Sequence, residues 1–313
     1  MSVRLQTIST GRDRHQPDSR PVGEHPARHT YRLWFALPSM ALIAIFFAVP
    51  FLANAVLSFT KWTGFSNTIS LNGLKNFASL FSLGILGHAT LVTIGFAITT
   101  MVGQNLAGLA LAKALQRSCH GNGFFRSVFF IPVLISPLAA GYIWGAILAA
   151  HGPVNQFISW ITQSDFSYGW LGDSHTALIL VGLIDAWKWS GLVTLVYIGG
   201  LNTIDRAVIE AATIDGAGFW KRFFAVELPL LAPAFTFNIV LTLVGSFNAM
   251  DVVFATTKGG PGDATSLLNV AVYSQFGQGL YGTSSALSFM IALLVIITAV
   301  PLMWSLRKRE VQA

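Results

Sequence analysis

Charged residues are scarce in this chain. Asp, Glu, Lys and Arg together make up 10% of its 313 residues, whereas a soluble domain carries about a quarter. That shortage excludes an ordinary soluble fold. Hydrophobic residues make up 53% of the chain, and its mean hydropathy is +0.62. Most of the protein surface must therefore face lipid.

Residues that carry chemistry are also few. The single cysteine, Cys119, cannot form a disulfide within the chain. No phosphate-binding G-x-x-x-x-G-K-[ST] loop occurs, because Lys258 precedes the nearby glycines instead of following them. The histidines lack the spacing of a metal site, and no nucleophile–base pair is evident. We therefore predict that the protein is not an enzyme and has no metal or cofactor of its own.

The formal net charge of +6 is concentrated at the two ends of the chain. The basic residues there are Arg4, Arg12, Arg14, Arg20, Arg28, Arg32, Arg307, Lys308 and Arg309. Basic clusters beside apolar segments orient a protein in a bilayer. We therefore expect a lipid bilayer, and no nucleic acid, as the partner of this charge.

The distribution of apolar residues predicts three parts. Residues 1–32 are too polar to form a core and are expected to be a disordered basic cytoplasmic tail, and residues 307–313 form a second tail. Residues 33–306 contain six apolar blocks, at about 33–59, 87–112, 128–150, 176–200, 230–256 and 285–304. Each approaches or exceeds the roughly 20 residues that a helix needs to cross a bilayer. Because the runs are continuous rather than alternating, they predict an all-α membrane protein with six transmembrane helices.

A cleavable signal peptide is the alternative for the first block, because Ala53-Asn54-Ala55 resembles a cleavage site. The block is about twice as long as the apolar region of a signal peptide. We therefore interpret it as a retained first span.

The loops predict the orientation. The N-terminal tail, the loops after the second and fourth blocks, and the C-terminus are basic, and the two loops contribute Lys113, Arg117, Arg126, Arg206, Lys221 and Arg222. The other three loops contain only Lys61, Lys75 and Lys258. The positive-inside rule then places both termini and residues 205–229 in the cytoplasm.

Shorter patterns predict local structure. Helical spacing of apolar residues favours a short surface helix containing Leu74, Phe77, Ala78 and Phe81. Aromatic side chains in the loop from His151 to His175 could anchor it at the membrane interface, namely Trp160, Tyr168 and Trp170. Small residues on one face of the third block favour close helix packing, namely Gly141, Gly145 and Ala149.

Residues 205–229, which we call the linker segment, have frequent charges within an apolar region. Asp205 can cap a helix that begins at Arg206, and Gly216 can take the left-handed conformation that ends it. A second short helix then places Phe219, Phe223 and Val226 on one face. Pro229 is expected to end the segment before the fifth span. By physical reasoning alone, an ordinary amphipathic loop resting on the membrane remains an alternative.

The motif Glu210-Ala-Ala-x3-Gly216-x9-Val226-x-Leu228-Pro229 resembles the EAA loop of permease subunits of binding-protein-dependent ABC importers. Val226 replaces the usual isoleucine. Further stretches are similar to the sugar-uptake branch of that family, which includes maltose and glycerol-phosphate permeases. They are Gly73-Leu-Lys-Asn-Phe77, Thr257-Lys-Gly-Gly-Pro-Gly-Asp-Ala-Thr265, Tyr273-Ser-Gln-Phe276 and Tyr281-Gly-Thr-Ser-Ser-Ala286. The resemblance extends from about residue 33 to 306.

This resemblance implies a type I importer fold in a bacterial or archaeal cytoplasmic membrane. It implies a second permease subunit, two copies of an ABC ATPase that binds the ATP, and an extracytoplasmic solute-binding protein. The residues that it implies for ATPase coupling are Glu210, Ala211, Ala212, Asp215, Gly216, Phe223, Leu228 and Pro229. The solute is expected to be a sugar, polyol or oligosaccharide that crosses by alternating access.

Polar residues inside the predicted spans are candidates for the substrate pathway. In the fourth block these are Asp185 and Lys188, for which mutual pairing is the structural alternative. In the fifth block they are Asn238, Ser246, Asn248 and Asp251, beside the aromatic Phe247. Polar helix packing explains this second group almost as well.

Two other functions remain open from the residues. A secondary carrier driven by an ion gradient would also contain several spans and buried charges. A membrane-bound enzyme would need a catalytic constellation, which the sequence does not contain.

Overall fold

The computed structural model describes residues 36–66, 68–116 and 122–308. The predicted tail at residues 1–32, residues 309–313 and Cys119 lie outside the described residues. The chain separates into two units, one ending at Ala48 and the other beginning at Val49. The described part of the first unit contains α1 (Leu37–Ile43) and the π-helix η2 (Ala44–Ala48).

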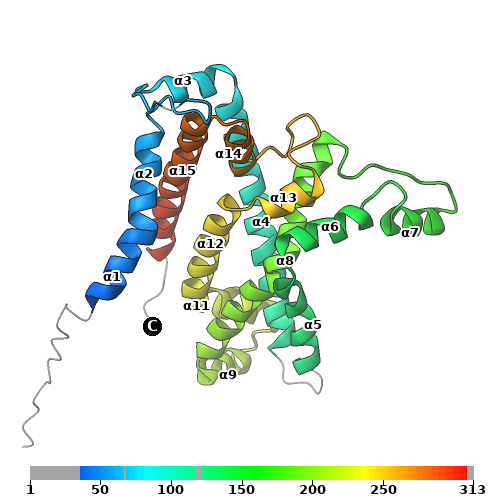
Figure 1. Cartoon of the computed structure of the whole chain (residues 1–313). Coiled ribbons are helices and arrows are strands. Elements are labelled where there is room, and N and C mark those ends of the chain that lie inside the picture. The colour runs from blue at the N-terminus through cyan, green and yellow to red at the C-terminus, as the bar shows by residue number, and fades with distance from the viewer. Residues whose placement is uncertain (1–35, 67, 117–121, 309–313) are drawn as a thin grey trace, which may run out of the picture. The chain divides into compact units, whose positions relative to one another are not determined.

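The second unit is helical throughout its described residues (Figure 1). Its only β-type pairing there is an isolated bridge between Thr60 and Leu71. Its helices are α2 (Val49–Leu57), α3 (Lys75–Ser82), α4 (Ile85–Leu115), α5 (Asn122–Leu134), α6 (Pro137–Ile147), α7 (Pro153–Thr162), α8 (Ser174–Thr203), α9 (Arg206–Ile214), α10 (Phe219–Arg222), the π-helix η3 (Phe223–Glu227), α11 (Leu228–Leu230), α12 (Ala232–Phe247), α13 (Asp251–Thr256), α14 (Leu268–Gly277) and α15 (Tyr281–Arg307).

Four helices in the described chain are long and apolar enough to cross a membrane. They are Leu37–Leu57, Ile85–Leu115, Ser174–Thr203 and Tyr281–Arg307, with 21, 31, 30 and 27 residues. They overlap the first, second, fourth and sixth predicted spans. Two bent helix pairs raise the number to as many as six if each pair is one span.

The third predicted span, 128–150, is not one continuous helix. It is divided between α5 and α6, which are bent by 100° relative to each other. Ser136 is extended, and its hydroxyl accepts a hydrogen bond from the Ala139 amide at 3.2 Å. Pro137 explains the break, because proline disfavours a helical conformation in the residue before it.

The fifth predicted span, 230–256, is also broken. Its helix α12 ends at Phe247, and α13 begins only at Asp251. The prediction that Pro229 ends the preceding segment is wrong, since helical structure continues from Phe219 to Leu230 and bends by 71° before α12. The break falls at Leu231, where Pro233, in the first turn of α12, cannot donate a backbone hydrogen bond.

A π-helical turn explains how Pro229 is accommodated. In η3, the Leu228 amide bonds back to the Phe223 carbonyl, five residues earlier. This wider turn moves the preceding carbonyls away from the proline ring, which would clash with them in a regular α-helix. The π-helix η2 likewise ends two residues before a proline, Pro50.

The core of the second unit is built on the close packing of α4 against α8. Glycines on both helices allow this approach. A Cβ atom placed on Gly103 would lie 2.8 Å from Ala186 Cβ, and one on Gly182 would lie 2.9 Å from Thr99 Cγ2. Because lipid gives no hydrophobic force between helices, association depends on van der Waals packing, and such small residues let the two backbones approach closely. Helix α12 packs against both α4 and α8.

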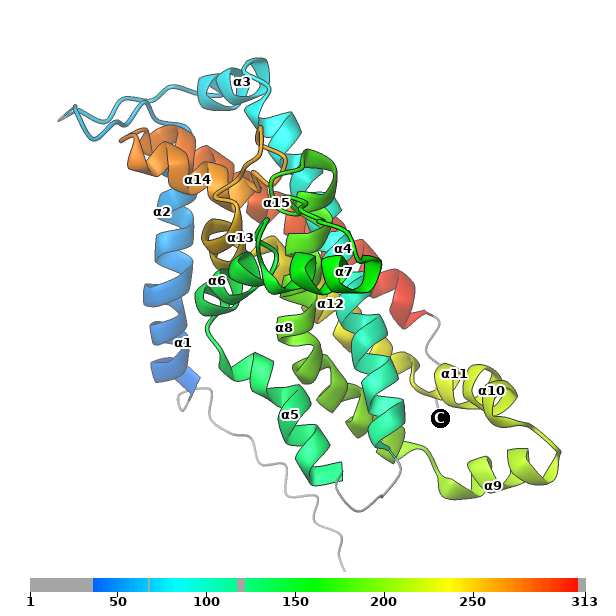
Figure 2. The same cartoon turned by 90° about the vertical axis from the view of Figure 1, so that its right-hand side faces the viewer.

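The end of the second unit that contains α3 and α14 lies opposite α9 (Figures 1 and 2). The short helix predicted around Phe77 is confirmed as α3, and the buried Asn76 amide fixes it by donating to the carbonyls of Ser58 and Thr60 at 2.8 and 2.9 Å. This is how α3 is joined to the end of α2.

The predicted loop from His151 to His175 contains α7. Trp170 packs against the core and donates to Asn155 at 2.8 Å, whereas Trp160 is exposed. Tyr168 donates a hydrogen bond to Asp173, the N-cap of α8, and this bond holds the pKa of Asp173 below its usual value. Of the three aromatic residues predicted to anchor this loop, Trp160 is therefore the exposed one.

The small residues of α6 differ in their packing. A Cβ atom on Gly141 would lie 2.5 Å from Ala255 Cβ of α13, while one on Gly145 would meet nothing within 4 Å. The predicted close approach therefore depends on Gly141.

Gly141→Ala should separate α6 from α13 and lower the thermal stability of the purified protein by about 1–3 kcal/mol, which is typical of overpacking. Gly145→Ala is the matched control, because its methyl group enters open space. Detergent-solubilised thermal unfolding measures both variants. Equal melting temperatures for the two would contradict the packing described here.

Candidate functional site

The linker segment forms an exposed projection. Helix α9 begins at the Asp205 cap, whose carboxylate accepts from the Ala207 amide at 2.9 Å, and none of its residues is buried. It ends at Ile214 with Asp215 as its C-cap, and Gly216 follows with φ +76°. The predicted pair of short helices divided at Gly216 is thus confirmed.

The residues proposed for coupling occupy different environments. Glu210, Ala211, Asp215, Gly216 and Pro229 are exposed, Ala212 and Leu228 are half-buried, and Phe223 is buried. The Glu210 carboxylate accepts from Arg206 Nε at 2.9 Å within α9. Two large apolar side chains of α9 are not covered by the rest of the described chain, since Val208 is 41% and Ile214 is 86% exposed. The exposed members could contact a partner, whereas Phe223 fixes the segment internally.

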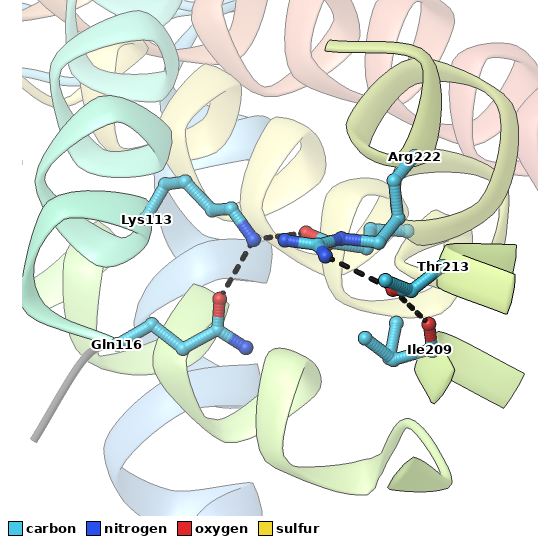
Figure 3. Close-up of polar contacts among 6 residues, drawn as sticks. Lys113, Gln116, Ile209, Thr213 and Arg222 are labelled. Atoms are coloured by element: carbon cyan, nitrogen blue, oxygen red, sulfur yellow. Dashed lines mark hydrogen bonds and ion pairs between the residues drawn. The ribbon is translucent and has the colours of Figure 1, made fainter. Parts of the chain in front are cut away.

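A buried ionic cluster joins the linker segment to α4 (Figure 3). Glu227 is 2% exposed and forms ion pairs with Lys113 of α4 and, at 3.3 Å, with Arg222. Sequence reasoning used Lys113 and Arg222 only as charges that set orientation, and it missed Glu227. An acidic residue in the apolar stretch Phe223–Leu230 was the available signal.

A cavity of about 400 Å³ lies where two helix breaks meet. Pro137 lines it from the α5–α6 break, and residues 248–252 line it from the α12–α13 break. Helix α8 contributes Asp185 and Trp189, while Gln104 of α4 and Thr242 of α12 add polar groups. The volume is that of a small-molecule site, and an aromatic ring beside several hydrogen-bonding groups suits a polar solute.

The structure brings only part of the predicted pathway set to this cavity. Asp185, Asn248 and Asp251 line it. By contrast, Asn238 donates to the Val193 carbonyl at 3.3 Å, Ser246 donates to the Thr242 carbonyl at 2.7 Å, and Phe247 lies in a core cluster. These last three residues follow the helix-packing alternative.

Asp185 and Lys188 do not pair directly. Lys188 Nζ lies 3.7 Å from the centre of the Trp189 ring, and Asp185 accepts instead from Gln104 Nε2 at 3.4 Å. Sequence reasoning missed Gln104 and Thr242, although a glutamine inside the second predicted span was a usable signal.

Neither the linker segment nor the cavity resembles a metal centre. Within the ranges that the structure describes, no three His, Cys, Asp or Glu side chains come close enough together to hold an ion.

Long apolar helices, two broken spans around a cavity and an exposed pair of short helices define a multi-pass membrane permease. The chain belongs to the family described as binding-protein-dependent transport system inner membrane component, whose model matches residues 27–308. It is therefore a transport subunit of the inner membrane.

Curated relatives agree with this family. The chain is 32% identical over 279 residues to the probable starch degradation products transport system permease protein AmyD of Thermoanaerobacterium thermosulfurigenes, covering 89% of this chain and 94% of that protein. It is 27% identical to the trehalose/maltose transport system permease protein MalF of Thermococcus litoralis, covering 83% and 88%. It is 32% identical to the sn-glycerol-3-phosphate transport system permease protein UgpA of Agrobacterium fabrum, also covering 83% and 88%.

Solved structures share the fold. A chain of a bacterial ABC transporter involved in the import of the acidic polysaccharide alginate matches with a TM-score of 0.75 at 19% identity, covering 89% of this chain and 96% of that one. A second alginate transporter structure, in complex with an alginate pentasaccharide-bound periplasmic protein, matches with a TM-score of 0.73. The predicted type I permease fold is thus confirmed.

Asp205→Ala should destabilise α9 by about 1 kcal/mol, because it removes the side-chain acceptor of the first turn. Amide hydrogen exchange in residues 206–214 should rise about fivefold. Asp215→Ala is the control, since it removes an equal charge from the other end of α9, where a carboxylate opposes the helix dipole. Slower exchange in the Asp205 variant than in the Asp215 variant would refute the assignment of the cap.

Proposed function

We propose that this chain is one membrane-spanning subunit of an ATP-driven importer that carries a sugar, polyol or oligosaccharide into the cell. A second permease subunit completes the pathway, two copies of a separate ATPase bind the ATP, and an external binding protein delivers the solute. The linker segment docks into a cleft of one ATPase subunit.

One observation supports this mechanism most directly. The linker segment is the covalent connection between α8 and α12, and both helices line the cavity through Asp185, Trp189 and Thr242. A force applied to α9 is therefore applied to two walls of the cavity. Rocking of these helices would open the cavity to one side of the membrane at a time.

The same arrangement supports a cytoplasmic location for the linker segment. Lys113 and Arg222 lie close to Thr213 of α9 (Figure 3), Lys221 precedes Arg222 in α10, and basic residues favour the cytoplasmic side. The ATPase would act there, with both termini on the same side.

Sugar chemistry suits the cavity. Hydroxyl groups can bond to Gln104, Asp185, Asn248 and Asp251, while the Trp189 ring offers a face for stacking. The names of the relatives, which refer to starch products, trehalose, maltose and glycerol phosphate, favour the same class of solute.

Copurification tests the docking. The wild-type complex should retain its ATPase subunit, and deletion of residues 205–229 should release it. Gly216→Leu should retain the ATPase but abolish uptake, because a left-handed residue with a side chain costs about 1–2 kcal/mol and turns α10 relative to α9.

Gly218→Leu is the matched control, since Gly218 has an ordinary φ of −63° and open space around it. Uptake is measured in proteoliposomes with ¹⁴C-labelled maltose, trehalose and lactose. Normal uptake by the Gly216 variant would refute the proposal that the conformation of Gly216, between α9 and α10, is needed for transport. Uptake that vanadate does not inhibit and that an ionophore abolishes would favour the ion-driven carrier.

Variants of the cavity test the pathway. Asn248→Ala and Asp251→Ala should each change the KM or kcat of uptake about fivefold, the value of one hydrogen bond. Gly245→Leu should block uptake in an assembled complex, because Gly245 lines the cavity and a Cβ atom placed on it would meet nothing within 4 Å. Gln278→Ala, an exposed amide outside the cavity, serves as the control. Unchanged uptake kinetics in all three cavity variants would refute the proposal that the cavity lies on the substrate pathway.

A further inference from the structure

A buried carboxylate is held between cations from two different parts of the chain. The Glu227 side chain is 3% exposed, that of Lys113 is 15% exposed and that of Arg222 is 25% exposed. A carboxylate removed from water needs charged partners, and loss of one partner is more damaging than loss of an exposed ion pair. The three side chains therefore form a specific connection rather than an incidental surface contact.

The π-helical turn creates half of this connection. Arg222 and Glu227 are five residues apart, and side chains at that spacing are not neighbours on an α-helix. The i→i+5 pattern of η3 brings them to the same face. The Arg222–Glu227 pair thus depends on the turn that accommodates Pro229.

Lys113 supplies the other half from a different helix. It lies in the last turn of α4, where a cation also offsets the helix dipole. Its ammonium group donates to Gln116 Oε1 at 2.8 Å and lies 5.6 and 5.8 Å from the ring centres of Phe219 and Phe223. The Lys113 ammonium group therefore lies beside aromatic rings of both α10 and η3, in addition to its ion pair with Glu227.

The connection extends to the exposed helix. Arg222 Nη1 donates to Thr213 Oγ1 of α9 at 3.3 Å, and Thr213 in turn donates to the Ile209 carbonyl at 2.8 Å (Figure 3). Helix α9 has few other contacts within the described chain. Side chains thus link α9 to α4 through Thr213, Arg222, Glu227 and Lys113.

We propose that Glu227 and Lys113 are positioning residues that make the linker segment and α4 move as one body, which rests on the coupling function proposed above. Helix α4 contributes Gln104 to the cavity, and Gln104 bonds to Asp185. Gln104 and Lys113 lie on one continuous helix. The ionic cluster therefore provides a third connection through which movement of the linker segment reaches the cavity, in addition to the covalent connections through α8 and α12.

The test compares solute uptake with ATP hydrolysis in the reconstituted complex. Glu227→Gln and Lys113→Met should lower the ratio of uptake to hydrolysis by about 5- to 100-fold, the usual range of a coupling interaction. Hydrolysis itself and copurification of the ATPase should persist. Lys113→Arg should retain the ratio because it retains the charge.

The double variant Glu227→Gln/Lys113→Met should be no worse than either single variant within about twofold, because both changes remove one interaction. Lys308→Met is the matched control, being a lysine at the end of α15 whose ammonium lies 3.5 Å from the Trp304 ring centre. The uptake probe is whichever of ¹⁴C-labelled maltose, trehalose and lactose the wild-type complex accumulates fastest.

A distance measurement tests the same proposal without a sugar. Spin labels at Leu91→Cys and Lys221→Cys, in a Cys119→Ser background, report the distance between α4 and α10 in the complex by pulsed electron resonance. Both positions are exposed. The wild-type distance distribution should stay single when ATP and vanadate are added, whereas Glu227→Gln should broaden or split it.

The outcomes separate the two proposals. If the ATPase does not copurify with the wild-type chain, the proposed function fails. If it does copurify, and Glu227→Gln leaves both the coupling ratio and the distance distribution unchanged, the ionic connection alone is refuted. A purely structural role would instead lower uptake, hydrolysis and assembly together.

Discussion

Inside a bilayer, each backbone amide and carbonyl needs a hydrogen-bonding partner within the protein, because lipid offers none. This constraint explains the helical fold and the location of its interruptions. The breaks before Pro137 and after Phe247 both open onto one cavity that is lined by α4, α8 and α12. Irregular backbone is tolerated there because protein and polar side chains surround it. The same breaks place Asn248 and Asp251 on the cavity wall.

Prolines direct much of the remaining architecture. Pro137 divides the third predicted span, and Pro233 turns α12 away from the preceding helix. Pro229 has a different effect, because a π-helical turn accommodates it without ending the helix. That turn also brings Glu227 beside Arg222. One local backbone adjustment thus continues the helix to Leu230 and contributes to the ionic connection to α4.

Predictability varied with the range of the interaction concerned. The Asp205 cap, the helix end at Gly216 and helix α3 depend on neighbouring residues, and the sequence pattern predicted each of them. The break at Pro137 was equally local and could have been predicted from Ser136-Pro137. The placement of Asn238, Ser246 and Phe247 could not be predicted. Polar and aromatic residues occur both on a cavity wall and between packed helices, so the residue type alone does not distinguish the two environments.

Hydropathy, charge distribution and the EAA motif by themselves determined the class of protein, the approximate spans and the position of the linker segment. These properties depend on composition and on short-range spacing, so they can be recognised without knowledge of the tertiary structure. Tertiary structure alone decided which polar residues meet at the cavity and that Asp185 bonds to Gln104 rather than to Lys188. It also decided that Lys113 pairs with Glu227, 114 positions along the chain. A sequence specifies each of these charges, but only the packing of α4 beside α10 and η3 brings them into contact.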